Sequence, residues 1–600
     1  MAQIEASQIR DIGIPVRSVN WVRLHPGHDQ DGAPCLYATM GQQADNLFVL
    51  QIELETGTCR QFVSEVPKSN YPTATLMSRT GQLYVGAAYA GHLLRFDPAT
   101  DRLTDLGAIN PGGATFPCRI DEGPDGQIWI GSYGAADLTS YNPETEQFTR
   151  YGRMDEVDMY NYPLFNFIDG TVACLITVTE PHVVVLNPQT GEKQTVGPVV
   201  PKGKGTIDLR RGNDGHLYIA SSEGNFRIEG MEAVPVEAIP DAPPSPALSD
   251  GSTFNFTDGG ALIYRQLEVR KPSGETRTFD LDYQAGGSDI FYLHAGPDGC
   301  VYGSSILPLH LFRYDPESGE LNNLGQCSTA TGEAYSMANL EGKIYISSYP
   351  GATLSEYDPA QPYHFGSQPD DNPRGLGRID DISYRPRSTL AGPLGRVWTA
   401  SVPDYGRWGG PLSCYDPKTG GKKAYYRICG DASCYTLAHL PDQELIAVGT
   451  TIAGGSGTQP KVNEAVLFLW DYNNEEKVWE SGLEPPVTAF NALLTGPDGR
   501  LYGTVQGGEL PATLFVFNPE SREFTHRLSL PDPNPRDLGL QNGPDGNIYG
   551  FTSASVYRLH PDSLEIEVIC EGSGFGIAGP ILGEELYFAT GHHLRAVKIF

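Results

Sequence analysis

The segment Gly123-Pro-Asp-Gly126, followed by Gln127-Ile-Trp-Ile-Gly-Ser132, decides the fold of this 600-residue chain. Proline presets the first turn angle and the final glycine supplies a positive φ, so these four residues close a tight turn between antiparallel strands. The same four residues recur at 296–299, 496–499 and 543–546, and weaker copies stand at 212–215 and 392–395. Their spacing indicates a repeat of about 45 residues.

Each repeat carries four short strands. An apolar run such as Arg500-Leu-Tyr-Gly-Thr504 follows the turn, and the next run ends in Asn-Pro or Asp-Pro, as in Phe515-Val-Phe-Asn-Pro519. Because that proline cannot continue a hydrogen-bond ladder, a second turn follows, and then a polar edge strand such as 146–151. Four strands per 40 to 50 residues, without helical periodicity, are typical of a β-propeller blade.

The number of repeats predicts two rings. Thirteen units begin near residues 20, 71, 116, 160, 206, 252, 290, 333, 385, 435, 488, 536 and 575. Because one ring holds about four to eight blades, we expect an all-β chain of tandem β-propellers with six to seven four-stranded antiparallel blades each. We place the first propeller at 1–326 and the second at 327–600, with long loops at 361–390, 402–411 and 450–463. The last unit ends before a fourth strand, so we expect segment 9–16 to close it.

The blade motif also resembles a known family. Gly-Pro-Asp-Gly-Gln-Ile-Trp-Ile-Gly at 123–131, with Tyr-Asn-Pro-Glu-Thr at 141–145, is similar to the virginiamycin B (streptogramin) lyase-like β-propeller superfamily. It also resembles propeller-type polysaccharide lyases. The resemblance covers nearly the whole chain and implies a propeller fold and a lyase class of activity. The chain has about twice the blades of those single-ring enzymes, and their catalytic residues find no counterpart here.

Composition narrows the partners. With 42 basic and 73 acidic side chains, the net charge is −31, which repels nucleic-acid backbones. No apolar run approaches the roughly 18 residues that span a bilayer, so we expect no membrane partner. The first residues lack a signal peptide's basic and apolar regions, which predicts a cytoplasmic protein, or a secreted or periplasmic one if a leader was removed. The oligomeric state stays open.

The sequence predicts no cofactor. Ten scattered cysteines form no zinc framework and are expected to be buried thiols. Two histidine pairs, His25 with His28 and His592 with His593, lack a convincing third ligand. We therefore expect no metal in the site, and leave a structural divalent cation open.

The inner strand of each blade lines the channel of its ring, so the residues that begin these strands should meet at one mouth. Counting back from each turn places aromatic and arginine side chains there: Tyr71, Phe116, Tyr160, Tyr162, Phe291, Arg385, Arg387, Tyr435, Asn491 and Arg536, with Tyr335 nearby. Aromatic faces stack on pyranose rings, and guanidinium groups grip carboxylates. The alternative is that the aromatics plug the channel and the arginines pair with acidic residues.

The least repetitive region carries the strongest anion-binding signal. Although the chain is acidic, its fourteen-residue stretch 374–387 contains four arginines, at positions 374, 378, 385 and 387. The loop 403–410 then adds Tyr405, Arg407 and Trp408. Extra loops on a rigid repeat scaffold often carry binding residues. We predict that Arg374, Arg378, Arg385, Arg387, Arg407, Trp408, Tyr160, Tyr162 and Tyr335 bind substrate. The alternative is a solvated loop whose arginines pair with Asp380 and Asp381.

These residues suit β-elimination from a uronate-containing glycan. That reaction needs a cation on the carboxylate, a base and a proton donor to the leaving oxygen. We assign the cation to Arg385 or Arg387, and acid–base roles to Tyr435, Tyr405 and His439, with His364 as another possible base. The partner would be an oligosaccharide or another small anionic ligand. A glycoside hydrolase, with two carboxyls drawn from Glu333, Asp404 and Glu464, and a non-enzymatic binding or scaffold propeller stay open as alternatives.

Overall fold

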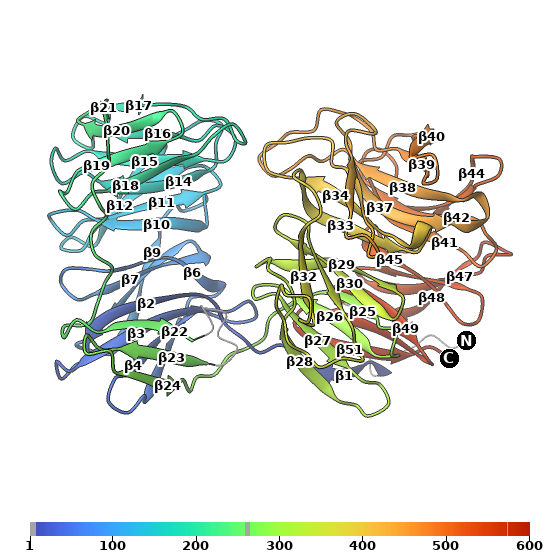
Figure 1. Ribbon diagram of the computed structural model, residues 1–600, viewed down its shortest axis with the longest axis horizontal. Helices are drawn as coiled ribbons and strands as arrows, with labels where there is room; N and C mark the ends of the chain where they lie inside the picture. Colours follow the sequence, from blue (N-terminus) through green and yellow to red (C-terminus); the bar gives the residue numbers. More distant parts are fainter. Residues whose placement is uncertain (1–7, 258–264, 573) are drawn as a thin grey trace. The chain divides into compact units, whose positions relative to one another are not determined.

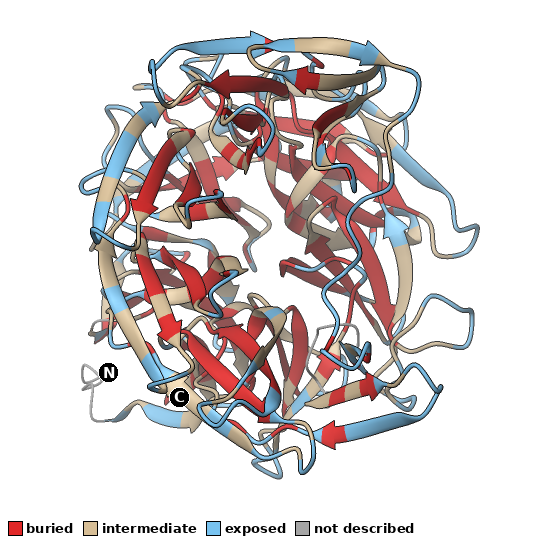
Figure 2. Cartoon of the chain, turned by 90° about the vertical axis from the view of Figure 1, so that its left-hand side faces the viewer, coloured by how far each residue is buried: buried red, intermediate tan, exposed pale blue. Residues whose placement is uncertain are grey.

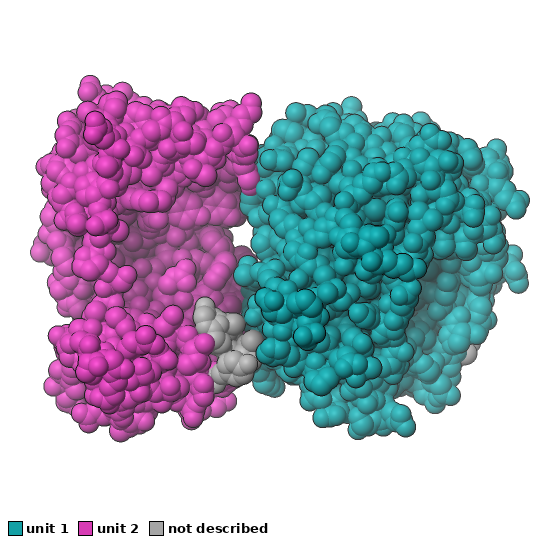
Figure 3. Space-filling view, in the orientation of Figure 1, with its two compact units in different colours: residues 1–17, 287–600 teal, residues 18–286 magenta. Residues whose placement is uncertain are grey.

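The computed structural model describes residues 8–257, 265–572 and 574–600, and it confirms an all-β chain of tandem propellers. Within these residues the helical elements are two 3₁₀ turns, η2 (Pro393–Gly395) and η3 (Pro441–Gln443). The chain forms two compact units, one of residues 18–286 and the other of residues 1–17 with 287–600 (Figure 3).

The unit formed by residues 18–286 holds five antiparallel sheets among its described residues, arranged around a centre (Figure 2). One sheet of eight strands spans two neighbouring blades, so the sheets form six blades. Its first three blades comprise β2 (Asn20–His28), β3 (Pro34–Gly41), β4 (Phe48–Glu53), β5 (Cys59–Val63); β6 (Ser69–Met77), β7 (Leu83–Tyr89), β8 (His92–Asp97), β9 (Arg102–Ala108); and β10 (Phe116–Glu122), β11 (Ile128–Tyr133), β12 (Asp137–Asn142), β13 (Gln147–Arg153). Its last three comprise β14 (Tyr160–Phe165), β15 (Val172–Thr177), β16 (His182–Leu186), β17 (Lys193–Val196); β18 (Ile207–Arg211), β19 (Leu217–Ser221), β20 (Gly224–Glu229), β21 (Glu232–Val236); and β22 (Thr253–Phe256), β23 (Gln266–Arg270), β24 (Thr276–Asp280). We call this unit the six-bladed ring.

The other unit holds six sheets among its described residues, and one of these again spans two neighbouring blades, so the sheets form seven blades. Its first four blades comprise β25 (Ile290–Ala295), β26 (Val301–Ser305), β27 (His310–Tyr314), β28 (Leu321–Gln326); β29 (Glu333–Leu340), β30 (Lys343–Tyr349), β31 (Thr353–Tyr357), β32 (Arg374–Arg378); β33 (Ser383–Ala391), β34 (Val397–Pro403), β35 (Leu412–Tyr415), β36 (Lys422–Tyr425); and β37 (Ser433–Leu440), β38 (Leu445–Thr451), β39 (Leu467–Asp471), β40 (Glu476–Ser481). Its last three comprise β41 (Ala489–Thr495), β42 (Leu501–Gln506), β43 (Thr513–Asn518), β44 (Glu523–Ser529); β45 (Pro535–Asn542), β46 (Ile548–Thr552), β47 (Ser555–Leu559), β48 (Ile566–Glu571); and β49 (Ile577–Leu582), β50 (Glu585–Thr590), β51 (His593–Lys598). We call this unit the seven-bladed ring.

The seven-bladed ring closes on itself through its inner strands. Each inner strand contacts the next, in the order β25, β29, β33, β37, β41, β45 and β49, and β49 contacts β25 again. The last blade takes its fourth strand from the N-terminal segment, where β1 (Arg10–Gly13) pairs antiparallel with β51 (Figure 1). A ring joined by strands from both ends of the chain leaves no unpaired edge at the junction.

The boundary between the units lies after residue 286, one blade earlier than the predicted 326. The blade of residues 290–326 belongs to the seven-bladed ring, because its inner strand β25 lies between β49 and β29. Its Ile290 and Val301 share a buried core with Leu594 and Ala596 of the last blade. The count of thirteen blades is right, and their division is six and seven.

One of the three predicted long loops is wrong. Segment 361–390 contains the edge strand β32 and most of the inner strand β33. Strand β32 has the sequence Arg-Gly-Leu-Gly-Arg, which lacks an apolar alternation, yet it pairs with β31 as an ordinary outer strand. The connections after β34 and β38 are loops, as expected.

The recurring turn is tied to a buried tyrosine. The turn aspartate accepts a hydrogen bond from a tyrosine hydroxyl four residues later, across 2.9 Å from Tyr302 to Asp298 and 2.8 Å from Tyr502 to Asp498. A Cβ on Gly296 would lie only 2.3 Å from the Tyr302 ring. In these copies glycine, aspartate and tyrosine are linked by packing and a hydrogen bond, which explains why they repeat together, and Trp129 takes the place of the tyrosine in the copy at 123–126.

Candidate functional site

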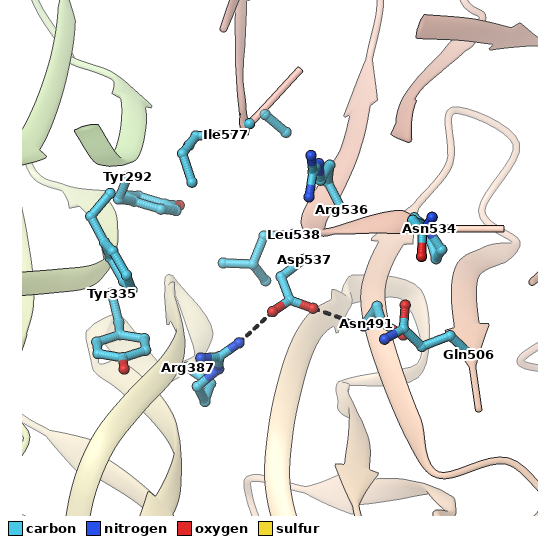
Figure 4. Close-up of a pocket in the computed structure, with 14 residues that line it drawn as sticks. Tyr292, Tyr335, Arg387, Asn491, Gln506, Asn534, Arg536, Asp537, Leu538 and Ile577 are labelled. Atoms are coloured by element: carbon cyan, nitrogen blue, oxygen red, sulfur yellow. Dashed lines mark hydrogen bonds and ion pairs between the residues drawn. The ribbon is translucent and has the colours of Figure 1, made fainter. Parts of the chain in front are cut away.

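A cavity of about 470 Å³ lies where the inner strands of the seven-bladed ring begin. Its walls come from β25, β29, β33, β41, β45 and β49, with the end of β42 and of two connections (Figure 4). The lining residues are Phe291, Tyr292, Tyr335, Arg387, Asn491, Gln506, Asn534, Pro535, Arg536, Asp537, Leu538, Gly576, Ile577 and Ala578. We call this place the channel mouth.

Four side chains from four consecutive blades form one polar cluster at the channel mouth. Arg387 pairs with Asp537 and donates a hydrogen bond to the Tyr435 hydroxyl across 2.5 Å. Tyr435 donates to Asp537 Oδ2 across 3.1 Å. Asn491 Nδ2 donates to Asp537 Oδ1 across 2.8 Å (Figure 4). Since each partner holds the others, these groups are preorganised.

Arg387 is also enclosed by aromatic rings. Its guanidinium carbon lies 5.0 Å from the ring centroid of Tyr335 and 4.6 Å from that of Tyr435. Ring faces attract a cation most strongly where water is excluded. The nearby charge of Asp537 and these tyrosines raise the pKa of Arg387, while burial acts in the opposite direction as the largest single effect. The guanidinium stays charged.

Arg385, two residues earlier on β33, lies among a second group of tyrosines. Its guanidinium carbon is 4.8 Å from the Tyr349 ring centroid and 5.2 Å from that of Tyr405. It donates a hydrogen bond to the Tyr405 hydroxyl across 3.4 Å, and the hydroxyls of Tyr349 and Tyr405 are 2.9 Å apart. No ion pair is recorded for Arg385 among the described residues. Its charge is thus held by rings and hydroxyls.

Glu333 is a buried carboxyl beside these arginines, with 8% of its surface exposed. Burial raises its pKa to about 7, although a hydrogen bond with Tyr335 and the charges of Arg385 and Arg387 act in the opposite direction. Burial also raises the pKa of Tyr335 to about 12, with the charge of Glu333 adding to the effect. A carboxyl with a pKa of about 7 therefore lies beside the residues that line the mouth.

Burial is the main cause of a raised pKa at Tyr435 as well. The carboxylate of Asp537 raises it further, and Arg387 lowers it. A phenol in this environment keeps its proton at neutral pH and can donate it.

Five of the predicted site residues lie together at or beside the channel mouth: Tyr335, Arg385, Arg387, Tyr405 and Tyr435. Arg374 and Arg378 lie instead on the outer strand β32. Arg374 pairs with Glu356 across 2.8 Å, and Arg378 donates to the carbonyl oxygens of Gly351 and Ser383. Both arginines stabilise contacts within the blade. The four guanidinium groups therefore do not form the predicted cluster: two lie on the outer strand β32 and two on the inner strand β33.

His439 lies four residues beyond Tyr435 on β37, where its register partner is Ile446. Four strand residues span about 13 Å, so the imidazole lies far along the channel from Tyr435. Its ring packs 5.9 Å from the Tyr472 ring centroid, and burial lowers its pKa. His364, the other possible base, is exposed and lies 3.6 Å from the carboxylate of Asp371.

Arg407 and Trp408 lie in the loop that follows β34. Backbone hydrogen bonds join this loop to the one after β38, from Gly406 to Ser456 across 3.0 Å and from Gly455 to Arg407 across 2.9 Å. The Trp408 indole donates to the Gln459 carbonyl across 2.8 Å. The two loops thus interlock at the end of the blades where Tyr405 lies.

Tyr160 and Tyr162 belong to the six-bladed ring. They lie on β14 with their rings parallel and 5.9 Å apart between centroids, and Arg119 lies 5.6 Å from the Tyr162 centroid. The residues lining the channel mouth of the seven-bladed ring do not include them.

Sequence analysis missed Asp537, which joins the cluster most closely. The alternation of a regular strand selects Arg536 as the inward residue. Between Pro535 and Leu540, however, the register of β45 shifts against β46, and Leu538 has a φ of 52°. This bulge turns the carboxylate of Asp537 toward Arg387. The signal that could have found it is the Pro-Asn-Pro-Arg-Asp sequence at 533–537, which is unlike the other blades.

No protein-family model and no curated protein matches this chain. Among similar solved structures, the extracellular domain of BT4673 from B. thetaiotaomicron is 12% identical, with 98% of this chain and 82% of that chain covered and a TM-score of 0.37. PorZ, a surface component of the type-IX secretion system of Porphyromonas gingivalis, is 11% identical, with 98% and 87% covered and a TM-score of 0.39. These likenesses concern the fold alone. The resemblance to the virginiamycin B lyase-like superfamily is not confirmed by them.

The described residues show two further features that bear on partners. None of their helices is long and apolar enough to cross a membrane. Nowhere among them do three His, Cys, Asp or Glu side chains converge as metal ligands would.

Proposed function

We propose that the seven-bladed ring binds a uronate-containing glycan at its channel mouth and cleaves it by β-elimination. The observation that carries the proposal is the meeting of two arginines, a phenol held by one of them, and a buried carboxyl with a pKa of about 7. These are the cation, proton donor and base that the reaction requires.

In this proposal Arg385 binds the uronate carboxylate. Its contacts are with tyrosine rings and a hydroxyl, so a bidentate carboxylate would supply its missing counter-ion. Neutralising that carboxylate stabilises the negative charge that develops when the neighbouring carbon loses its proton. Arg387 is already paired with Asp537, and its part is to hold Tyr435 in position.

Glu333 is the proposed base. A carboxyl with a pKa of about 7 is ionised in a large fraction of molecules at neutral pH, and it is basic enough to take a proton from carbon. It takes the place assigned from sequence to His439, which lies farther along the channel.

Tyr435 is the proposed acid. Glu333 removes the proton beside the carboxylate, the electron pair forms a carbon–carbon double bond, and the glycosidic carbon–oxygen bond breaks. The leaving oxygen takes the Tyr435 proton, and solvent returns both residues to their starting protonation states. The raised pKa of Tyr435 keeps its proton in place until the leaving oxygen needs it.

Glycan binding without cleavage is the second candidate. The mutual hydrogen bonds of Arg387, Tyr435, Asp537 and Asn491 favour it, because a preorganised surface binds without needing to react. A hydrolase would need two carboxyls that flank the bond, and Asp537 is already committed to an ion pair.

The test is to incubate the protein with polygalacturonate, alginate and a glucuronan, and to follow ultraviolet absorbance and reducing ends together. A lyase raises both, because each cut leaves an unsaturated uronate. An increase in reducing ends without an increase in absorbance would show hydrolysis. If neither signal rises and the glycan still binds, the protein has the binding role.

A further inference from the structure

The six-bladed ring carries a continuous row of aromatic side chains. Neighbouring rings along this row lie between 4.3 and 6.1 Å apart, centroid to centroid. We call the row the aromatic arc, and its members are Trp21, Tyr71, Tyr89, Phe116, Tyr133, Tyr160 and Tyr162.

The aromatic arc lies at one end of four consecutive blades. Tyr71, Phe116 and Tyr160 stand at or near the start of their inner strands β6, β10 and β14. Tyr133 ends the second strand β11, where it pairs with Phe116 in one direction and with Tyr160 in the other. The arc therefore follows the channel mouth of this ring from blade to blade.

The arc presents ring surface to solvent. Tyr89 is 49% exposed, and Tyr71 beneath it is fully buried. The other members are half-buried. Aromatic side chains of this size normally lose nearly all their exposure in a folded core, so a row of partly open rings at one mouth is unusual for packing alone.

Two members of the arc are held in a backbone conformation that bulky residues rarely adopt. Trp21 has a φ of 48° and Tyr89 a φ of 63°. Such left-handed residues persist only where the surrounding structure fixes them, and they cluster at ligand-binding sites. Here the unusual backbone places both rings against Tyr71 and Phe116.

Arg119 adds a hydrogen-bond donor at the end of the arc. Its guanidinium carbon lies 5.6 Å from the Tyr162 ring centroid. Its buried Nη1 has no hydrogen-bond acceptor among the described residues. Buried donors are nearly always paired, so we infer that this nitrogen serves a ligand oxygen at the mouth.

We propose that the mouth of the six-bladed ring is a second carbohydrate site, which binds a neutral pyranose glycan along the aromatic arc. Pyranose faces are apolar and their edges carry hydroxyls, which matches aromatic ring faces with one arginine donor beside them. A single guanidinium among seven aromatic rings favours a neutral sugar, in contrast to the arginine pair of the seven-bladed ring. The site is independent of the proposed lyase function.

The test is calorimetric titration of the full chain with cellohexaose, xylohexaose and mannohexaose. At least one of them should bind, and Tyr89→Gly should weaken it about tenfold or more, because the most exposed ring is lost. Glycine accepts a positive φ without strain, so this variant should keep its melting temperature. Arg119→Gln should weaken binding as well. The matched control is Tyr426→Ala, since Tyr426 of the seven-bladed ring is 46% exposed.

Three results would overturn the proposal. One is that none of the three hexasaccharides binds at concentrations up to about 10 mM. Another is that Tyr89→Gly and Arg119→Gln both bind as tightly as the unaltered chain. The third is that Arg385→Ala, in the other ring, removes the binding as completely as Tyr89→Gly does.

Discussion

The guanidinium of Arg387 donates to the hydroxyl of Tyr435 across 2.5 Å, and so joins the third and fourth blades of the seven-bladed ring. Asp537, from the sixth blade, contacts both groups. A phenol fixed by a cation on one side and a carboxylate on the other has a single orientation for its proton. The roles proposed for the channel mouth depend on this geometry.

Tyr435→Phe should lower turnover of an acidic glycan by about 10²-fold and leave its binding nearly unchanged. The substitution keeps the ring that covers Arg387 and removes only the hydroxyl that would transfer a proton. Single-turnover kinetics and equilibrium binding measure the two effects separately. Tyr363→Phe is the control, because the Tyr363 hydroxyl donates to the Gln326 carbonyl within the same ring. Equal losses of turnover in both variants would rule out a specific role for Tyr435.

Arg385→Gln should weaken the binding of an acidic oligosaccharide by roughly ten- to hundredfold, because a hydrogen bond between two charged groups is worth about 1.5–3 kcal/mol. Arg374→Gln provides the comparison. Arg374 is paired with Glu356 on the outer side of the blade, so its loss should change melting temperature rather than affinity. Titration calorimetry with trigalacturonate distinguishes them. An unchanged affinity in a folded Arg385→Gln variant would remove this arginine from the site.

Glu333 should give the protein a pH dependence. Its pKa is 4.5 in an ordinary setting and about 7 in the fold, so the unfolded chain ionises it first. The folded state therefore loses stability as pH rises from about 4.5 to about 7, and keeps the whole contribution below that range. The loss is on the order of 3 kcal/mol. Glu333→Gln should abolish it in urea unfolding at about pH 5 and pH 8. If the free energy of unfolding falls equally in both proteins, groups other than Glu333 cause the pH dependence.

Turnover should also depend on the ionisation of Glu333, but it should rise with pH where stability falls. As a base Glu333 acts only when ionised, so turnover should rise with pH through about 7. A pH–rate profile of kcat/KM on polygalacturonate checks this. Turnover that falls through that range would exclude Glu333 as the base.

Deleting residues 1–13 should destabilise the seven-bladed ring. The deletion removes β1, which pairs with β51, and exposes an open edge in the last blade. Arg10→Ala should have a far smaller effect, because its ion pair with Glu585 is largely exposed. Calorimetric melting should show one lowered transition and one unchanged transition. A truncated chain that melts like the full one would show that β1 contributes little.

The sequence predicted the blades more accurately than their grouping. A glycine, an aspartate and an aromatic residue at fixed spacing are local requirements of this turn, so each blade that uses the turn can be recognised by itself. Membership of a ring is not local. It depends on the contact between β25 and β49, whose residues lie almost 300 positions apart, and the Gly-Pro-Asp-Gly turn of the blade at 290–326 is found in both rings.

The candidate site was predictable where the inner strands depart from regular pairing by only one residue. Arg385, Arg387 and Tyr435 lie at such one-residue register shifts of β33 and β37, and the structure brings the last two within hydrogen-bonding distance. Asp537 follows a bulge, which reverses the expected alternation. His439 has the right residue type, but lies too far along its strand. A side chain reaches the site only if it lies at the right position along its strand as well as on the inward face.

The pair of Arg387 and Asp537 makes a final prediction about ligand charge. Asp537 neutralises the guanidinium and places a negative charge where an acidic sugar would bind. Asp537→Asn keeps the shape and the contact with Asn491, and leaves Arg387 free to attract a carboxylate. We therefore expect affinity for trigalacturonate to rise about tenfold, and more strongly at low salt than at high salt.

The same substitution should reduce stability, because Arg387 is left buried without its counter-ion. Adding trigalacturonate should restore the melting temperature, since the ligand takes over the role of Asp537. Asn491→Ala serves as the control: it removes the amide bonded to Asp537 and leaves the charge in place. It should not raise affinity. If Asp537→Asn binds trigalacturonate more weakly than the unaltered protein, the Asp537 carboxylate is a ligand-binding group, and the acidic sugar does not take its place at Arg387.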